Sequence, residues 1–137
     1  MMKTFLAALR TYLTGNSSIN GAATGGVHAG RAPSGAAAPY VVWSYRGKQN
    51  RALDTGGREL AAMTVRFECY SASAAEAAET AEVIATQLAG WSGDLSGCSL
   101  LVARALGDGL ELSQGLSGDG DEGWRAFVDV EFLVQLS

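Results

Sequence analysis

A short polar segment contains four basic residues, although the net charge of the whole chain is −4: Arg46, Lys48, Arg51 and Arg58. Arginine and lysine side chains can form ion pairs with a negatively charged partner. Guanidinium and ammonium groups can pair with an acidic protein surface or with the phosphates of a nucleic acid. No aromatic residue is interleaved with them, so the segment offers bases no stacking platform. A solvated loop without a binding role has the same composition. The pattern therefore leaves open a solvated loop, an arm that contacts an acidic partner, and the lining of a channel that nucleic acid crosses.

Residues that commonly perform catalysis or bind metals form no recognisable pattern in this sequence. His28 is the single histidine and lies in a glycine-rich stretch without a nearby nucleophile or carboxylate. Zinc sites need clusters of Cys and His ligands, and Cys-x-x-Cys spacing is absent. The acidic stretch 117–123 lacks the spacing of an EF-hand calcium loop, and Gly47-Lys48-Gln49 lacks the glycines and the hydroxyl of a phosphate loop. We expect no cofactor, no bound metal and no enzymatic activity.

The charges are divided unequally along the chain. Residues 1–58 contain seven basic residues against one acid, a net of +6, whereas residues 59–137 contain three against thirteen, a net of −10. Folding can bring the basic and acidic residues together, so that their charges neutralise one another within one molecule. Alternatively, folding can place them on two separate surfaces, so that the basic surface of one copy attracts the acidic surface of another.

Length and composition indicate one domain with a substantial core, because 137 residues are 47% hydrophobic. No apolar run reaches the roughly 20 residues that a membrane-spanning helix needs. The first residues resemble the start of a signal peptide, but Arg10 and Tyr12 interrupt the apolar stretch, so we expect an amphipathic helix rather than secretion. Cys69 and Cys98 both fall in apolar runs, which favours buried, reduced thiols in an intracellular protein.

A strand followed directly by a helix organises the rest of the chain. Residues alternate with a period of two from Met63 to Tyr70, which predicts a half-buried antiparallel strand. Ser73 stands three residues before Glu76, a pattern that can satisfy two orphan amides at a helix start, and Gly90 supplies a stop. The helix over 73–89 has an apolar face made mostly of alanine, so we expect it to lie close against the sheet.

The other expected elements complete an α+β domain, in which a mainly antiparallel sheet packs against the central helix and an N-terminal helix. They are a helix over 2–14, a loose Gly/Ala-rich connection over 15–38 with one short strand near 27–29, a strand over 40–45, a basic loop over 46–58, a strand over 99–106, a hairpin turn at 107–109 into 110–114, an acidic turn at 117–123 and a long strand over 124–136 inside the sheet.

The order and spacing of these pieces carry a resemblance to a known family. The matching stretches are Arg31–Pro33, Ala38–Val42, Ala52–Gly56, Val65–Ser71 leading into Ala75–Glu79, and the closing Phe127–Phe132. From about Val27 onward the chain resembles the tail completion or tail terminator proteins of long-tailed double-stranded DNA bacteriophages. The segments 15–30 and 117–123 have no counterpart in that resemblance.

The resemblance implies a structural virion protein, assembled in the host cytoplasm, that forms a ring at the head-proximal end of the tail tube. The ring, expected to be a hexamer, would end tube polymerisation and provide the surface on which the head docks. Its partners would be other copies of itself, the tail tube protein and the head–tail connector, with possible non-specific contact to passing DNA and none to a membrane. Arg46, Lys48, Arg51 and Arg58 would contact a neighbour, the tube or the channel lumen. Two alternatives remain: a head-closure or neck adaptor, and a small-ligand-binding module with its pocket between sheet and helix.

Overall fold

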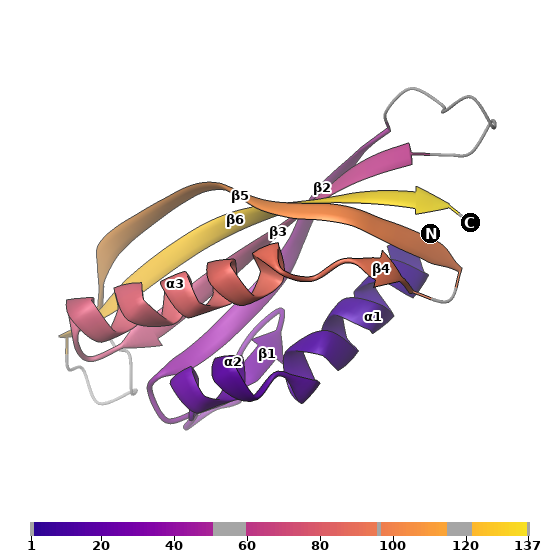
Figure 1. Cartoon of the computed structure of the whole chain (residues 1–137). Coiled ribbons are helices and arrows are strands. Elements are labelled where there is room, and N and C mark those ends of the chain that lie inside the picture. Colours follow the sequence, from indigo (N-terminus) through magenta and orange to yellow (C-terminus); the bar gives the residue numbers. More distant parts are fainter. Residues whose placement is uncertain (1, 51–59, 96, 115–121, 137) are drawn as a thin grey trace.

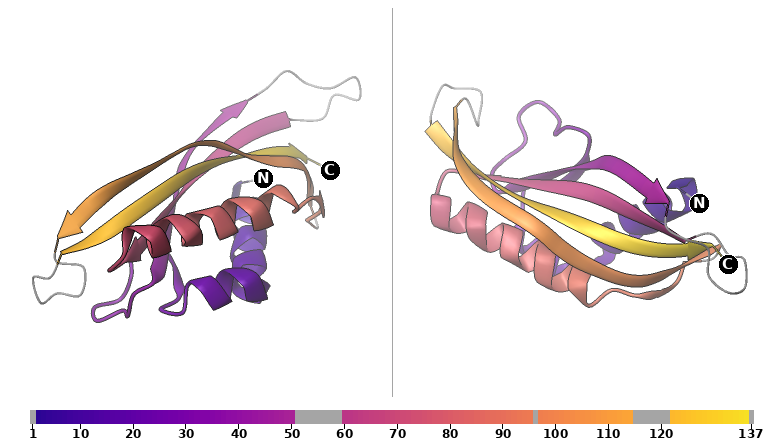
Figure 2. Two further views of the ribbon diagram at one scale, coloured as in Figure 1. Left: turned by 60° about the vertical axis from the view of Figure 1, so that its left-hand side comes forward. Right: turned by 90° about the horizontal axis from the view of Figure 1, so that it is seen from above.

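A computed structural model describes residues 2–50, 60–95, 97–114 and 122–136. Within these residues a six-stranded sheet has the strand order β1-β2-β3-β6-β5-β4 and is antiparallel except for the β1–β2 pair. The three helices lie on one face of this curled sheet (Figures 1 and 2). The expected α+β class, a mainly antiparallel sheet covered by helices, is confirmed.

The centre of the sheet is β3 (Leu60–Ser71), and its predicted alternation is confirmed. The residues predicted to face inward are fully buried and pack in the core under the helices. They are Met63, Val65, Phe67 and Cys69.

Helix α3 (Ala74–Ala89) begins and ends as the sequence indicates, with Ser73 as its N-cap and Gly90 as its C-cap. The Ser73 Oγ accepts a hydrogen bond from the Glu76 amide at 3.3 Å. The Glu76 carboxylate, however, accepts from the Ser71 Oγ at 2.5 Å, and the Ser73 amide donates to the same Ser71 Oγ at 3.3 Å. Ser71 thus stands between the two members of the predicted capping pair and ties the helix start to the end of β3.

Helix α1 (Met2–Gly15) covers the sheet with Phe5, Leu9 and Leu13, all buried. The Phe5 ring lies 5.0 Å from that of Phe132 on the sheet, measured between centroids. Hydrophobic burial along one helical stripe therefore holds the N-terminal helix against the core, as predicted.

The expectation of a loose connection over 15–38 is wrong for its first part. Helix α2 (Ser17–Ala22) forms there because the Asn16 side chain accepts a hydrogen bond from the Ile19 amide at 3.0 Å. Ile19 is fully buried and anchors the short helix. The predicted short strand is present as β1 (Val27–Ala29), which pairs with β2 in parallel.

Strand β2 (Tyr40–Asn50) is longer than predicted, so the start of the expected basic loop is strand instead. Its pairing with β3 continues to Asn50 opposite Ala61, with a bulge between Tyr45 and Gly47. Pairing continues because β3 satisfies the backbone groups of β2 along this length. Gly47 adopts a φ of +152° beside the bulge, a conformation that side chains rarely allow.

Strand β5 (Cys98–Gln114) corrects a second expectation, because no hairpin turn occurs at 107–109. Gly107, Asp108 and Gly109 all pair with β6, so the strand continues through them without a turn. A Cβ at Gly109 would lie 2.4 Å from the Phe127 ring, which explains this glycine as room for an aromatic side chain rather than as a turn.

Strand β6 (Glu122–Leu136) lies between β3 and β5, as expected for the long C-terminal strand. The two-residue strand β4 (Gly93–Asp94) closes the far side of the sheet. Most of the predicted acidic turn lies outside the described residues, and its last two residues begin β6.

Both cysteines are buried and unpaired, as predicted. Burial raises the pKa of the Cys69 thiol to about 12, so it stays protonated and unreactive at neutral pH. No helix in the described part of the chain is long and apolar enough to cross a membrane. Among the same residues, no group of His, Cys, Asp or Glu has the arrangement of a metal site.

Candidate interaction surfaces

The two ends of the strand order carry opposite charge. The first 53 residues contain no acid, so α1, α2, β1 and β2 carry only basic charges. Arg31, Arg46 and Lys48 are exposed on or just after β1 and β2. Helix α3 and strand β5 carry five exposed acids against the single basic residue Arg104. Glu82, Asp108 and Glu111 lie on or next to β5, whereas Glu76 and Glu79 lie on the side of α3 that borders α2 and the start of β2.

Between these ends, the uncovered face of the sheet carries ion pairs that involve all three basic residues of the acidic half. Arg66 forms a bidentate pair with Asp129, at 2.8 and 3.0 Å, and its guanidinium lies 4.4 Å from the Phe127 ring centroid. The hydrogen bonds that the Arg66 guanidinium donates to the Asp129 carboxylate raise the pKa of Arg66. Arg125 pairs with Glu68 and Glu111, and Arg104 pairs with Glu131. These three arginines therefore pair with acids from their own half of the sequence.

The predicted basic residues fall into two groups. Arg46 and Lys48 are exposed on β2, and Arg51 and Arg58 lie outside the described residues. Strand β1 pairs only with Val41–Trp43, so among the described residues no strand borders the other side of residues 44–50. We call residues 44–50 the β2 edge. Figure 1 shows β2 and β3 running beyond the helices at this point, which makes the β2 edge accessible to a partner.

A second open edge lies at the other end of the sheet. Strand β4 pairs only with Ser99 and Leu100, so in the described part of the chain no strand borders residues 101–112, which we call the β5 edge. Five large apolar side chains on it are between 45% and 51% exposed: Leu101, Val102, Leu106, Leu110 and Leu112. An unpaired strand with this much exposed apolar surface is typical of a protein–protein interface.

Sequence reasoning missed the β5 edge because the supposed turn at Gly107–Gly109 divided it into two short strands. The signal available was the placement of leucine and valine on both faces of the run from Ser99 to Leu112, where a strand with one solvated face would alternate. Bulges at Leu101 and Leu106 interrupt that alternation, since neither residue has a partner on β6.

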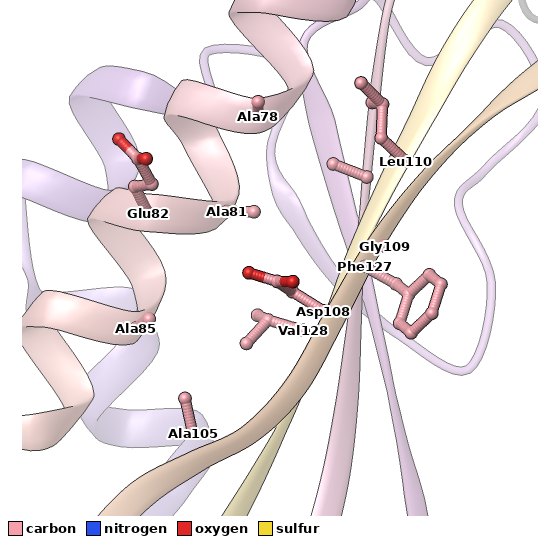
Figure 3. A pocket seen from close by; sticks show the side chains of 11 residues that line it. Ala78, Ala81, Glu82, Ala85, Ala105, Asp108, Gly109, Leu110, Phe127 and Val128 are labelled. Carbon is pink, nitrogen blue, oxygen red and sulfur yellow. The ribbon is translucent and has the colours of Figure 1, made fainter.

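A cleft of about 250 Å³ separates α3 from β5 (Figure 3). Ala78, Ala81 and Ala85 of α3 form one wall, and Leu110 contributes to the other. Asp108 points from β5 into the space between strand and helix (Figure 3). The lining residues include two carboxylates but no histidine, serine, cysteine or basic side chain, so the cleft suits an apolar or positively charged segment rather than acyl or phosphoryl transfer.

His28 lies in β1 and makes local contacts there. Its Nε2 lies 3.0 Å from the Gly25 carbonyl oxygen, and its ring lies beside that of Tyr40 with centroids 6.4 Å apart.

Comparison with known proteins gives a family match and a fold match. The family model "Tail completion protein gp17" matches residues 7–135 of this chain. Among solved structures 18 chains match, and one belongs to a structure titled "Virion of native gene transfer agent (GTA) particle". That chain is 17% identical, with a TM-score of 0.68 over 94% of this chain and 92% of its own length, which shows the shared fold. No curated protein sequence matches.

Proposed function

The chain belongs to the tail completion protein gp17 family, and from this premise we propose that it forms a ring at the head-proximal end of a phage tail tube. Family membership makes it a structural protein of a phage-type tail. In the proposal the ring ends tube polymerisation, presents the docking surface for the head–tail connector and lets DNA pass through its lumen. A copy is one domain, six copies form the ring, and assembly takes place in the host cytoplasm before the ring becomes part of the virion.

The observation that carries this proposal is the placement of opposite charges at the two ends of one sheet. A copy with a basic surface at β2 and an acidic surface at α3 and β5 can bind the next copy head to tail. A contact between two different surfaces repeats from copy to copy and closes into a ring when the rotation permits. A two-fold dimer that joined β2 to β2 would instead place like charges together.

Size in solution tests the proposal. We expect light scattering behind a sizing column to show a monomer at low concentration and a ring-sized species at high concentration. With the purified tail tube protein, electron microscopy should show tubes capped at one end and shorter than tubes grown alone. A chain that stays monomeric at every concentration and leaves tube length unchanged would refute the proposal.

The four predicted basic residues supply a second test. Replacing Arg46, Lys48, Arg51 and Arg58 together with serine should weaken ring assembly or tube capping, because it removes four positive charges from one short segment of the sequence. The matched control replaces two exposed basic residues of α1, Lys3 and Arg10, with serine. Equal assembly of both variants and the unmodified chain would mean that this basic segment has no part in assembly.

Two other functions give different results in these assays. A neck or head-closure adaptor would bind the connector but would not cap tubes. A small-ligand-binding module would use the α3–β5 cleft as its pocket. It would remain a monomer and would show a thermal shift with a ligand that fits between Ala81 and Asp108.

A further inference from the structure

We propose that neighbouring copies in the ring are joined through their two open sheet edges, with the β2 edge of one copy bound along the β5 edge and at the α3–β5 cleft of the next. This inference rests on the proposed ring and names the surfaces that build it. The occupant of the β5 edge is therefore a second copy of this chain.

The first argument is the pattern of strand pairing. Short strands cover only part of the outermost long strands: β1 covers Val41–Trp43 of β2, and β4 covers Ser99 and Leu100 of β5. The remaining edges leave backbone N–H and C=O groups without a strand partner in the described chain. An added strand satisfies such groups and contributes main-chain hydrogen bonds to binding. Because the two open edges lie at opposite ends of the strand order, joining them extends one sheet from copy to copy.

Charge decides which edges meet. The β2 edge carries Arg46 and Lys48, whereas the β5 edge and the adjoining helix carry Asp108 and Glu82 at the cleft. Pairing β2 with β2 would bring Arg46 and Lys48 next to the same basic residues of the other copy, while pairing β2 with β5 brings them toward Asp108 and Glu82. These like-charge contacts disfavour a β2–β2 dimer and favour the head-to-tail arrangement that a ring needs.

The apolar side chains supply the area that such a contact would bury. The β5 edge contains neither lysine nor proline, and its charged residues Arg104, Asp108 and Glu111 are interspersed with large apolar side chains. Its bulges leave Leu101 and Leu106 without partners on β6, and both side chains are about half exposed. Leu110 borders the acidic cleft, so apolar and ionic contacts to a neighbouring strand would lie side by side.

Cross-linking between copies tests the contact directly. Gln49→Cys lies on the exposed β2 edge and Leu106→Cys on the β5 edge, and the native Cys69 and Cys98 are buried. The two variants are mixed as full chains and treated with a short bis-maleimide. We expect a covalent dimer in the mixture and little in either variant alone. A dimer that forms equally well in one variant alone, or cross-linking of the Leu106→Cys copy to added tube protein in preference to a second copy, would overturn the inference.

Charge exchange gives an independent readout. Arg46→Glu or Asp108→Arg should each raise the concentration for half-assembly at least about tenfold, corresponding to about 1.4 kcal/mol. A chain that carries both substitutions should recover most of the assembly, because opposite charges again meet. Arg10→Glu, an equal charge reversal on exposed α1, is the matched control and should assemble normally. Thermal melts confirm that each variant is folded.

The two proposals fail in different ways. If the unmodified chain forms rings and caps tubes while the cross-links are absent and the charge exchanges have no effect, the edge contact is wrong and the proposed function stands. If the unmodified chain forms no ring and caps no tube, the proposed function fails, and the edge contact fails with it.

Discussion

The bidentate pair between Arg66 and Asp129 should contribute more to stability than an exposed ion pair on the same sheet. Two charges about 4 Å apart attract by about 4 kcal/mol at an effective dielectric constant of 20, before desolvation and side-chain ordering oppose them. The Arg66 and Asp129 side chains are only 29% and 23% exposed, and the contact is bidentate. We therefore expect a coupling free energy of about 1 to 2 kcal/mol, above the usual range for surface pairs.

A double-mutant cycle measures this coupling. Arg66→Gln, Asp129→Asn and the double variant are unfolded in urea, and the coupling is the departure of the three free-energy changes from additivity. The pair between Arg104 and Glu131 is the internal control, because the Arg104 side chain is 64% exposed. Its coupling should stay below about 0.5 kcal/mol. If the two cycles give equal couplings, the reasoning from burial and bidentate geometry is refuted.

Three further predictions concern the core, a helix cap and a thiol. Leu9→Ala should lower the free energy of unfolding by about 2 to 5 kcal/mol, because this fully buried side chain holds α1 on the sheet. Replacing the half-buried Leu6 with alanine should cost less. Equal losses in urea unfolding would contradict the conclusion that Leu9 is the residue that anchors α1. Ser73→Ala should cost about 1 kcal/mol because it removes the hydroxyl that caps α3, whereas Ser73→Gly should cost a few tenths because glycine is itself a favourable N-cap residue; thermal melts that rank them in reverse would contradict this. Burial raises the pKa of Cys69 from its ordinary 9.0 to about 12, so above pH 9 the thiol loses its proton in the unfolded chain but keeps it in the folded one. The free energy of unfolding should therefore fall as pH rises from 9 toward 12. Cys69→Ala should flatten that decline in urea unfolding, and an unchanged dependence of the unfolding free energy on pH would contradict the shift.

Local patterns in the sequence predicted the elements whose neighbours along the chain decide their structure. The alternation around Val65 predicted β3, and the Ser73 cap with the Gly90 stop predicted α3 to within a residue. The apolar stripe of Phe5, Leu6, Leu9 and Leu13 similarly predicted α1, and all of these but the half-buried Leu6 are buried. In each case the periodicity or the capping group is complete within a dozen or so residues, so the sequence contains the information.

The sequence failed where a contact from a distant segment decided the structure. Glycines at 107 and 109 indicate a turn by composition, but β6 pairs with them and the Phe127 ring occupies the space that Gly109 leaves free. The sequence pattern predicts a loop at Arg46 and Lys48, but pairing with β3 extends β2 through both residues. The two open edges, which are the candidate interaction surfaces, likewise depend on which strands are neighbours.

The sequence by itself determined the fold class, the order of most elements, the resemblance to a tail completion family and the unequal division of charge between the two halves of the chain. Only the tertiary structure decided where that charge lies, because strand order sets β2 and β5 at opposite ends of one sheet while Arg66, Arg104 and Arg125 pair with acids of their own half. Local propensity acts through neighbouring residues, whereas strand order depends on contacts between residues far apart in the sequence. That difference is the physical reason why the elements could be predicted and the interaction surfaces could not.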